Sequence, residues 1–152
     1  LTARELLTSF GRLHGLEEEA IRDRLEWLIT ALSLGDYIDR PAGRLSSGQR
    51  QRISLGRALV HNPPALVLDE PTNALDVVGS RDLLDTLDRL REGGHAILLS
   101  THRLHEIEHR CNRFVIIDKG HIVAAGSRNA LVGNAGELED AFFHAIEQGA
   151  PS

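Results

Sequence analysis

Two short apolar runs separated by a helix-like segment constrain the fold more than any other feature of the sequence. The runs are Ala65–Leu68, which follows Pro63-Pro64, and Ala96–Leu99. A continuous apolar run of this length, bounded by turn residues, is typical of a buried strand. The segment 80–91 between them has helical character and ends before Gly93-Gly94, where a helix readily stops. Strand, helix, strand in this order predicts a parallel sheet and an α/β fold.

The first third of the chain is predicted to be helical throughout. Between Thr2 and Leu34, apolar residues recur at intervals of three and four, with charged residues between them. This spacing is the pattern of amphipathic helices, and Gly15 divides the stretch into two of them. Ser46 precedes a further periodic run that ends at Val60, so we expect Ser46 to cap a third helix.

The last third is predicted to contain a helix, a strand hairpin and a closing helix. A short helix is expected over 103–110, after the second apolar run. Two further apolar runs, 114–117 and 122–125, flank Asp118-Lys119-Gly120-His121, a sequence typical of a turn between two antiparallel strands. The segment 138–146 has helical character.

Charge and composition exclude several classes of protein. The chain has 22 acidic and 17 basic residues and a formal net charge of −5, which argues against binding to a nucleic-acid backbone. No apolar stretch is long enough for a transmembrane helix or a signal peptide. The single cysteine, Cys111, cannot form an internal disulfide, as is usual in a reducing compartment.

The chain lacks methionine and begins at Leu1 within helix-like sequence, so we expect it to be a fragment truncated at its N-terminal side.

Two adjacent carboxylates follow the first apolar run. Asp69 and Glu70 would lie at the carboxyl end of a parallel strand, which is where α/β sheets bind their ligands. Mg²⁺ prefers oxygen ligands, so one carboxylate could hold the ion while the other polarises an attacking water. The alternative is that the two acids only end a strand at the solvent, and for an isolated pair that alternative is favoured.

The predicted start of the third helix has the character of a phosphate-binding surface. Leu45-Ser46-Ser47-Gly48-Gln49 brings a hydroxyl, a glycine and backbone N–H groups to a positive helix end. The alternative is an ordinary serine cap followed by a flexible glycine.

The order of these motifs resembles that of one enzyme family. The third helix continues into Gly56-Arg57-Ala58-Leu59, the first apolar run continues into Asp69-Glu70-Pro71-Thr72, and Asn73-Ala74-Leu75-Asp76 and Ser100-Thr101-His102 follow. Residues 45–49, with the helix that follows them, resemble the signature motif of the ATP-binding-cassette (ABC) ATPases. The first apolar run with Asp69–Thr72 resembles the Walker B motif of that family, Asn73–Asp76 resembles its D-loop, and Ser100–His102 resembles its switch histidine. The resemblance implies the C-terminal portion of a P-loop NTPase, a RecA-like parallel sheet core with an ABC α-helical subdomain. Segment 116–127 resembles the closing hairpin of transporter-type cassettes, and segment 138–142 resembles the tail of the bacterial drug- or sodium-export types.

The resemblance implies that the signature residues contact ATP bound by another subunit. Ser46, Ser47, Gly48 and Gln49 would contact the γ-phosphate of that nucleotide. The third signature position is usually glycine in the family and is Ser47 here, a departure that crowds the approach of the phosphate.

The resemblance also implies roles for four residues outside the signature. Asp69 would support Mg²⁺ and Glu70 would activate the attacking water. His102 would contact the γ-phosphate and position that water, and Asp76 would connect the sites of the two subunits.

A transport-coupled ATPase is the function that the resemblance implies. Its partners would be a second nucleotide-binding subunit, arranged head to tail, and a transmembrane permease subunit, at the cytoplasmic face of the membrane. No nucleic-acid partner is expected. The helical subdomain would span residues 1–56, the remaining core 57–126 and a helical tail 127–152.

The family's phosphate loop, adenine platform and Q-loop would precede the region that matches. The only lysine, Lys119, is followed by glycine, so these 152 residues contain no G-x-x-x-x-G-K-[ST] loop. This chain alone is therefore expected to bind ATP poorly and to be inactive. If strands that flank Ala65–Leu68 are missing, we also expect an exposed apolar sheet surface and a tendency to associate.

Three alternatives to this function remain open at this point. The chain could be a degenerate, signature-only partner, or part of a non-transport cassette, although no coiled-coil insertion, tandem cassette or basic arm is present. His105-Glu106-Ile107-Glu108-His109 also matches the H-E-x-x-H pattern of zinc hydrolases. Such a short pattern arises readily by chance; His121 or Glu137 would have to supply the third ligand.

Overall fold

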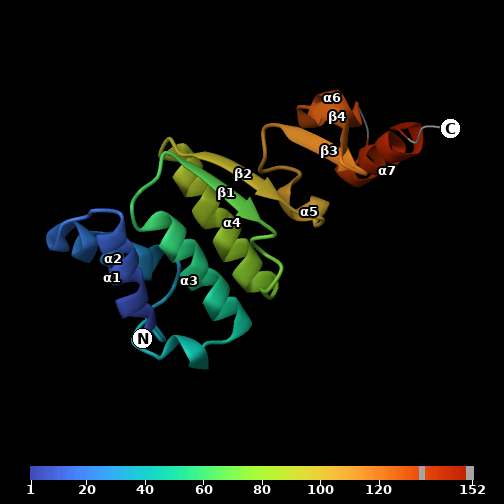
Figure 1. Cartoon of the computed structure of the whole chain (residues 1–152). Helices are drawn as coiled ribbons and strands as arrows, with labels where there is room; N and C mark the ends of the chain where they lie inside the picture. Colours follow the sequence, from blue (N-terminus) through green and yellow to red (C-terminus); the bar gives the residue numbers. More distant parts are fainter. Residues whose placement is uncertain (134–135, 150–152) are drawn as a thin grey trace. The chain divides into compact units, whose positions relative to one another are not determined.

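The computed structural model describes residues 1–133 and 136–149. The chain forms two compact units, Leu1–Ser100 and Thr101–Ser152 (Figure 1). The first unit contains the helices α1–α4, a short 3₁₀ helix and the strands β1 and β2, and the second contains β3, β4 and the helices α5–α7.

Three helices form the first part of unit one, as predicted. They are α1 (Ala3–Leu13), α2 (Glu18–Ala31) and α3 (Ser47–Leu59). Gly15, with a φ of 76°, lies between α1 and α2, where a side chain would be strained. The 3₁₀ helix η1 (Ala42–Arg44) precedes α3.

Glycines let α1 pack closely against both neighbouring helices. A Cβ atom at Gly11 would lie 2.8 Å from Cγ1 of Ile21 on α2. A Cβ atom at Gly56 of α3 would lie 3.2 Å from Cδ2 of Leu7 on α1. Leu7 and Ile21 are both buried, so the apolar faces predicted from periodicity meet at these glycines.

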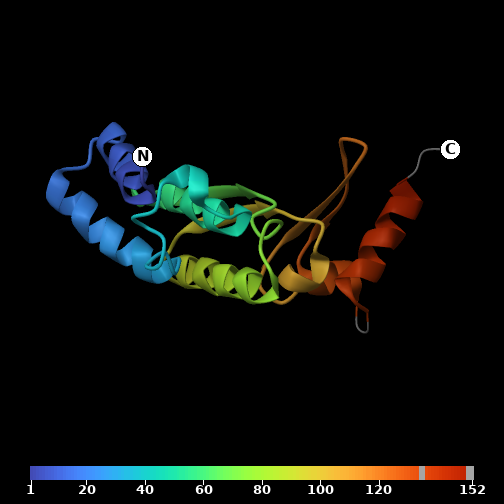
Figure 2. The same cartoon turned by 90° about the horizontal axis from the view of Figure 1, so that it is seen from below.

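A parallel strand pair forms the second part of unit one, which confirms the predicted α/β class. β1 (Ala65–Asp69) pairs in parallel with β2 (Ala96–Ser100), and α4 (Val77–Glu92) connects them. Helix α4 runs along one face of the strand pair (Figures 1 and 2). It contributes buried leucines at positions 83, 84, 87 and 90.

The prediction that the first apolar run is a buried strand is wrong for one of its two faces. Leu66 is buried, whereas Val67 is 79% exposed and its register partner Leu98 is 65% exposed. Successive residues of a strand point to opposite faces, and α4 covers only one of them. The expected exposed apolar sheet surface is thereby confirmed.

The second unit is built on an antiparallel hairpin, as predicted. β3 (Phe114–Asp118) pairs with β4 (His121–Gly126). Lys119 and Gly120 both have positive φ, 48° and 82°, which is the geometry of a type I′ turn.

The described part of unit two also contains the helices α5 (Leu104–Ile107), α6 (Arg128–Val132) and α7 (Leu138–Gly149). Helix α5 is shorter than the helix predicted over 103–110. Glu108, the residue after it, accepts hydrogen bonds from Arg128 Nη2 at 2.6 Å and from the Leu138 N–H at 3.0 Å. The Arg128 contact lowers the pKa of Glu108, so this carboxylate connects the starts of α6 and α7. In the described part of the chain, none of the helices has the length and hydropathy of a membrane span.

Protonation of His61 is predicted to destabilise unit one. The His61 ring stacks on His14 with centroids 3.8 Å apart. Burial, then the nearby His14 and Arg24, lower the pKa of His61. The unfolded chain therefore takes up this proton first. The contribution of His61 to stability is complete above its unfolded pKa of about 6.5 and is lost as the pH falls from there through the folded pKa.

Urea unfolding followed by Trp27 fluorescence tests this prediction at about pH 7.5 and about pH 5.5, on either side of that unfolded value. The midpoint of the wild type should fall on acidification, and that of His61→Gln should fall less. His121→Gln removes an exposed histidine and should keep the wild-type dependence. Equal losses in the wild type and His61→Gln would contradict the assignment.

The exposed sheet face is predicted to cause self-association. Replacing Val67 and Leu98 together by threonine places a β-branched residue, which suits a strand, at both positions and reduces the apolar surface. Sedimentation velocity over a range of concentrations should show association of the wild type and less association of the double variant. Leu13→Thr, which changes an exposed leucine outside the sheet, is the matched control. A wild type that stays monomeric throughout would refute the prediction.

Candidate functional site

Helix α3 begins with a capping box formed by the predicted site residues. The Gln49 N–H donates to Ser46 Oγ at 3.2 Å, and the Ser46 N–H donates to Gln49 Oε1 at 3.0 Å. Ser46 is therefore the N-cap, as predicted, and Ser47 is the first helical residue. The first turn of α3 holds no acidic residue, unlike the first turns of α1 and α2. The positive end of α3 therefore lacks an acidic side chain of its own in that turn, which favours an external anion.

The start of α3 packs against the loop that follows β1. A Cβ atom at Gly48 would lie 3.2 Å from Leu75 Cδ2 and 3.3 Å from the Ala74 carbonyl oxygen. One turn further on, Gln51 Nε2 donates to the Pro71 carbonyl at 3.2 Å. Gly48 thus permits a close approach between the signature residues and the D-loop, two motifs well separated in the sequence.

The two strand-end carboxylates have different surroundings. Asp69 is exposed and accepts a hydrogen bond from the Ser100 hydroxyl. The Glu70 N–H lies 3.1 Å from the Ser100 carbonyl oxygen and 3.3 Å from its hydroxyl oxygen. Glu70 has a φ of 45°, a conformation uncommon for a residue with a side chain and frequent at functional turns.

Ser100 is a site residue to which the sequence analysis gave no role. The pairing of β1 with β2 places Ser100 opposite Asp69. Once two parallel strands are expected, the last polar residue of each could have been predicted to meet at the same sheet edge. The pairing of the two strands is therefore the information from which the role of Ser100 could have been predicted.

The donor set at this edge fits Mg²⁺. Asp69 provides carboxylate oxygens beside the Ser100 hydroxyl, and oxygen ligands are those that Mg²⁺ prefers. Within 1–133 and 136–149, three or more His, Cys, Asp or Glu side chains do not come together as a metal-binding group. One carboxylate is enough for an ion that keeps several waters and binds substrate phosphates.

Asp76 caps helix α4. Its Oδ1 accepts a hydrogen bond from the Gly79 N–H at 2.7 Å. The last residue of the D-loop therefore also caps the first turn of α4. The connection between subunits expected for Asp76 stays a prediction.

His102 and the H-E-x-x-H sequence belong to the second unit. His102 directly follows Thr101, whose hydroxyl accepts from the Arg103 N–H at 3.0 Å, and its phosphate role stays a prediction. Helix α5 ends at Ile107, so it does not carry both His105 and His109. Glu106 is paired with Arg103 at 3.1 Å, an arrangement that does not favour the zinc alternative.

Comparison with known proteins agrees with the geometry of these motifs. A sequence model described as ABC transporter matches residues 2–73. The chain is 34% identical over 131 residues to the ABC transporter ATP-binding protein NatA of Bacillus subtilis (strain 168), covering 86% of this chain and 53% of that protein. It is 37% identical over 131 residues to the Nod factor export ATP-binding protein I of Burkholderia lata, covering 86% of this chain and 43% of that protein.

A solved structure supports the same assignment. The fold is similar to a structure of an ATP binding subunit of an ABC transporter, with a TM-score of 0.87 and 27% identity, over 96% of this chain and 62% of that one. The chain spans about half the length of the curated relatives it matches. With the signature helix, the strand-end carboxylates and the parallel strand pair in their expected order, the chain belongs to the family of ABC transporter ATP-binding proteins and has the fold of P-loop NTPases.

Proposed function

We propose that this chain is part of an ATP-hydrolysing subunit of an ABC exporter. The observation that carries the proposal is the packing of α3 onto the loop after β1, through Gly48 and Gln51. This packing supports the proposal because it brings the start of α3, whose N–H groups could attract a phosphate, next to the loop that follows Asp69 and Glu70. Two relatives named above support the class, since one is an ABC transporter ATP-binding protein and another a Nod factor export ATP-binding protein.

In this proposal the start of α3 binds the γ-phosphate of ATP held by a second subunit. The capping box holds Ser46 and Gln49 at the helix end. Backbone N–H groups and the partial positive charge of the helix attract the phosphate. Gly48 permits the close approach of α3 to the D-loop, and Ser47 adds a hydroxyl where the family usually has glycine.

Hydrolysis is assigned to the carboxyl end of β1. Asp69, oriented by the Ser100 hydroxyl, would hold Mg²⁺, which when bound neutralises charge on the phosphate oxygens. Glu70 would accept a proton from the water that attacks the γ-phosphorus. His102 would contact the γ-phosphate and orient that water, while Asp76 would transmit the state of one site to the other.

The partners follow from the same proposal. A second nucleotide-binding subunit would complete each site head to tail, and a transmembrane permease would use the closure of the dimer for export. The subunit would sit at the cytoplasmic face of the membrane as a peripheral component. Residues 1–56 would act as the helical subdomain, 57–126 as core and 127–152 as tail. The net charge of −5 gives no support to a nucleic-acid partner.

A carboxylate at residue 46 should separate helix capping from phosphate binding. Aspartate caps helices about as well as serine, so Ser46→Asp should unfold within about 0.5 kcal/mol of the wild type. Its charge would repel the γ-phosphate, so ATP-dependent association with the nucleotide-bearing subunit should be lost. Thr2→Asp is the matched control, because Thr2 forms the same kind of capping box on α1. Undiminished association of Ser46→Asp would contradict the phosphate role.

Neutralising Glu70 should remove hydrolysis and leave ATP binding intact. The test uses the natural gene product that includes these residues and measures Mg²⁺-dependent ATP hydrolysis. Loss of a general base costs about 10²- to 10⁴-fold in rate, and Glu70→Gln should fall in that range. Glu26→Gln, which changes an exposed carboxylate on α2, should keep the wild-type rate.

The association and hydrolysis measurements together test the alternative of a degenerate partner. ATP-dependent association without hydrolysis in the wild type would favour a degenerate, signature-only partner. Hydrolysis that is equal in the wild type and Glu70→Gln would contradict the assignment of the base.

A further inference from the structure

The carbonyl end of helix α2 is held by two other helices. The last carbonyls of a helix have no partner within it. At the end of α2, the Leu34 N–H donates to the Ile29 carbonyl at 2.9 Å, and Ser33 has a φ of 53°. This is a Schellman turn, in which backbone N–H groups satisfy the earlier carbonyls. The carbonyls of Ala31 and Leu32 receive side-chain donors instead.

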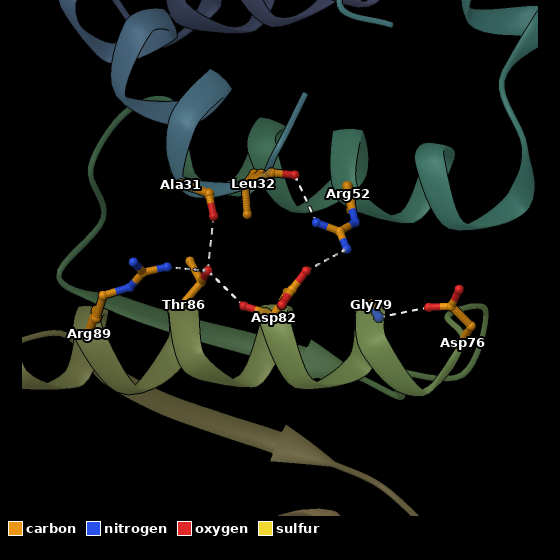
Figure 3. Close-up of polar contacts among 8 residues, drawn as sticks. All are labelled: Ala31, Leu32, Arg52, Asp76, Gly79, Asp82, Thr86 and Arg89. Carbon is orange, nitrogen blue, oxygen red and sulfur yellow. Dashed lines mark hydrogen bonds and ion pairs between the residues drawn. The ribbon is translucent and has the colours of Figure 1, made fainter. Parts of the chain in front are cut away.

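Thr86 of α4 binds the first of these carbonyls. Its hydroxyl lies 2.9 Å from the Ala31 carbonyl oxygen and 2.9 Å from the Asp82 carbonyl oxygen (Figure 3). Arg89 Nη2 donates to the same hydroxyl oxygen at 3.0 Å, so the single hydroxyl hydrogen is shared between the Ala31 and Asp82 carbonyls. Thr86 is only 2% exposed, which makes an unmet hydrogen bond costly there.

Arg52 of α3 binds the second carbonyl. Its Nη1 donates to the Leu32 carbonyl at 3.0 Å, and its Nη2 lies 3.8 Å from Asp82 Oδ2 on α4 (Figure 3). The last turn of α2 contains no basic residue of its own. Arg52 therefore provides the cation that the negative end of a helix favours.

We propose that Arg52 and Thr86 are positioning residues that clamp the carbonyl end of α2 to α3 and α4 at the same time. The α2 clamp consists of Arg52, Asp82, Thr86 and Arg89. Because its bonds reach both helices, a displacement of α2 is transmitted to α3 and, independently, to α4.

The clamp connects α2 to both helices that begin in the candidate site. Helix α3 starts after Ser46, and α4 starts after Asp76, whose cap on Gly79 lies one turn before Asp82 (Figure 3). A force on α1 and α2 would thus reach the D-loop through α4 as well as the signature through α3. This functional meaning rests on the proposed function, whereas the clamp itself does not.

Hydrogen exchange of the 152-residue chain without nucleotide tests the clamp. Thr86→Val removes the hydroxyl and keeps the side-chain shape, so the Leu34 amide should exchange about tenfold faster, the usual effect of losing one hydrogen bond. Thr86→Ser should restore protection to within about twofold of the wild type. Arg52→Met should produce the same local increase by removing the other bond. Thr30→Val is the matched control, because it removes a hydroxyl bond to the carbonyl four residues earlier on an exposed face of α2.

Two results would overturn the clamp. One is unchanged exchange at Leu34 in both Thr86→Val and Arg52→Met. The other is an equal increase at Leu34 and at the buried end of α3, for example Val60, because that would report general destabilisation without local release. Since no ATP is present, either result leaves the hydrolysis test of Glu70 unaffected, and a failure of that test leaves the clamp unaffected.

Discussion

The packing of helix α3 is the constraint on which the rest of the first unit depends. At Gly56 it admits Leu7 of α1, through Arg52 it holds the end of α2, and through Gln51 it binds the Pro71 carbonyl after β1. These contacts come from different turns of one helix. A shift of α3 along its axis would therefore disturb all of them, and the residues at its start keep a fixed place beside the D-loop.

The site combines structural and chemical demands on the same residues. Ser46 caps α3 and Asp76 caps α4, and the proposed function gives the same two residues a phosphate contact and an intersubunit contact. At the strand end, Ser100 both continues the pairing of β2 with β1 and orients Asp69. The Ser46 and Asp76 side chains are held by backbone N–H groups and Asp69 by a hydroxyl, and such fixed groups are what a pre-organised electrostatic site requires.

Local patterns in the sequence predicted the elements of the fold, and they failed where a neighbour decides the outcome. Periodicity was enough for α1 and α2, periodicity and the Ser46 cap were enough for α3, and the Lys119-Gly120 turn was enough for the hairpin. The exposed face at Val67 could not be predicted, because an apolar run does not show which of its faces is covered. The clamp was also invisible: Thr86 and Arg52 bond to backbone carbonyls 55 and 20 residues away. Every residue carries such a carbonyl, so no partner residue type identifies the contact.

The candidate site was predictable as a set of motifs and less so as a geometry. The order of residues 45–49, Asp69-Glu70 and Asp76 pointed to the family. The role of Ser100 needed the strand register, and the contact of Gly48 with Leu75 needed the packing of α3. The phosphate contacts of Ser46 and His102 remain predictions.

The proposed function depends on the binding of the terminal phosphate of ATP by the start of α3. The most direct measurement is a structure of the natural gene product containing Glu70→Gln, determined with Mg²⁺ and ATP. We expect a γ-phosphate within hydrogen-bond distance, about 3 Å, of Ser46 Oγ and the backbone N–H groups that follow it, with the nucleotide held by another subunit. A nucleotide-bound dimer in which the start of α3 faces solvent would contradict it.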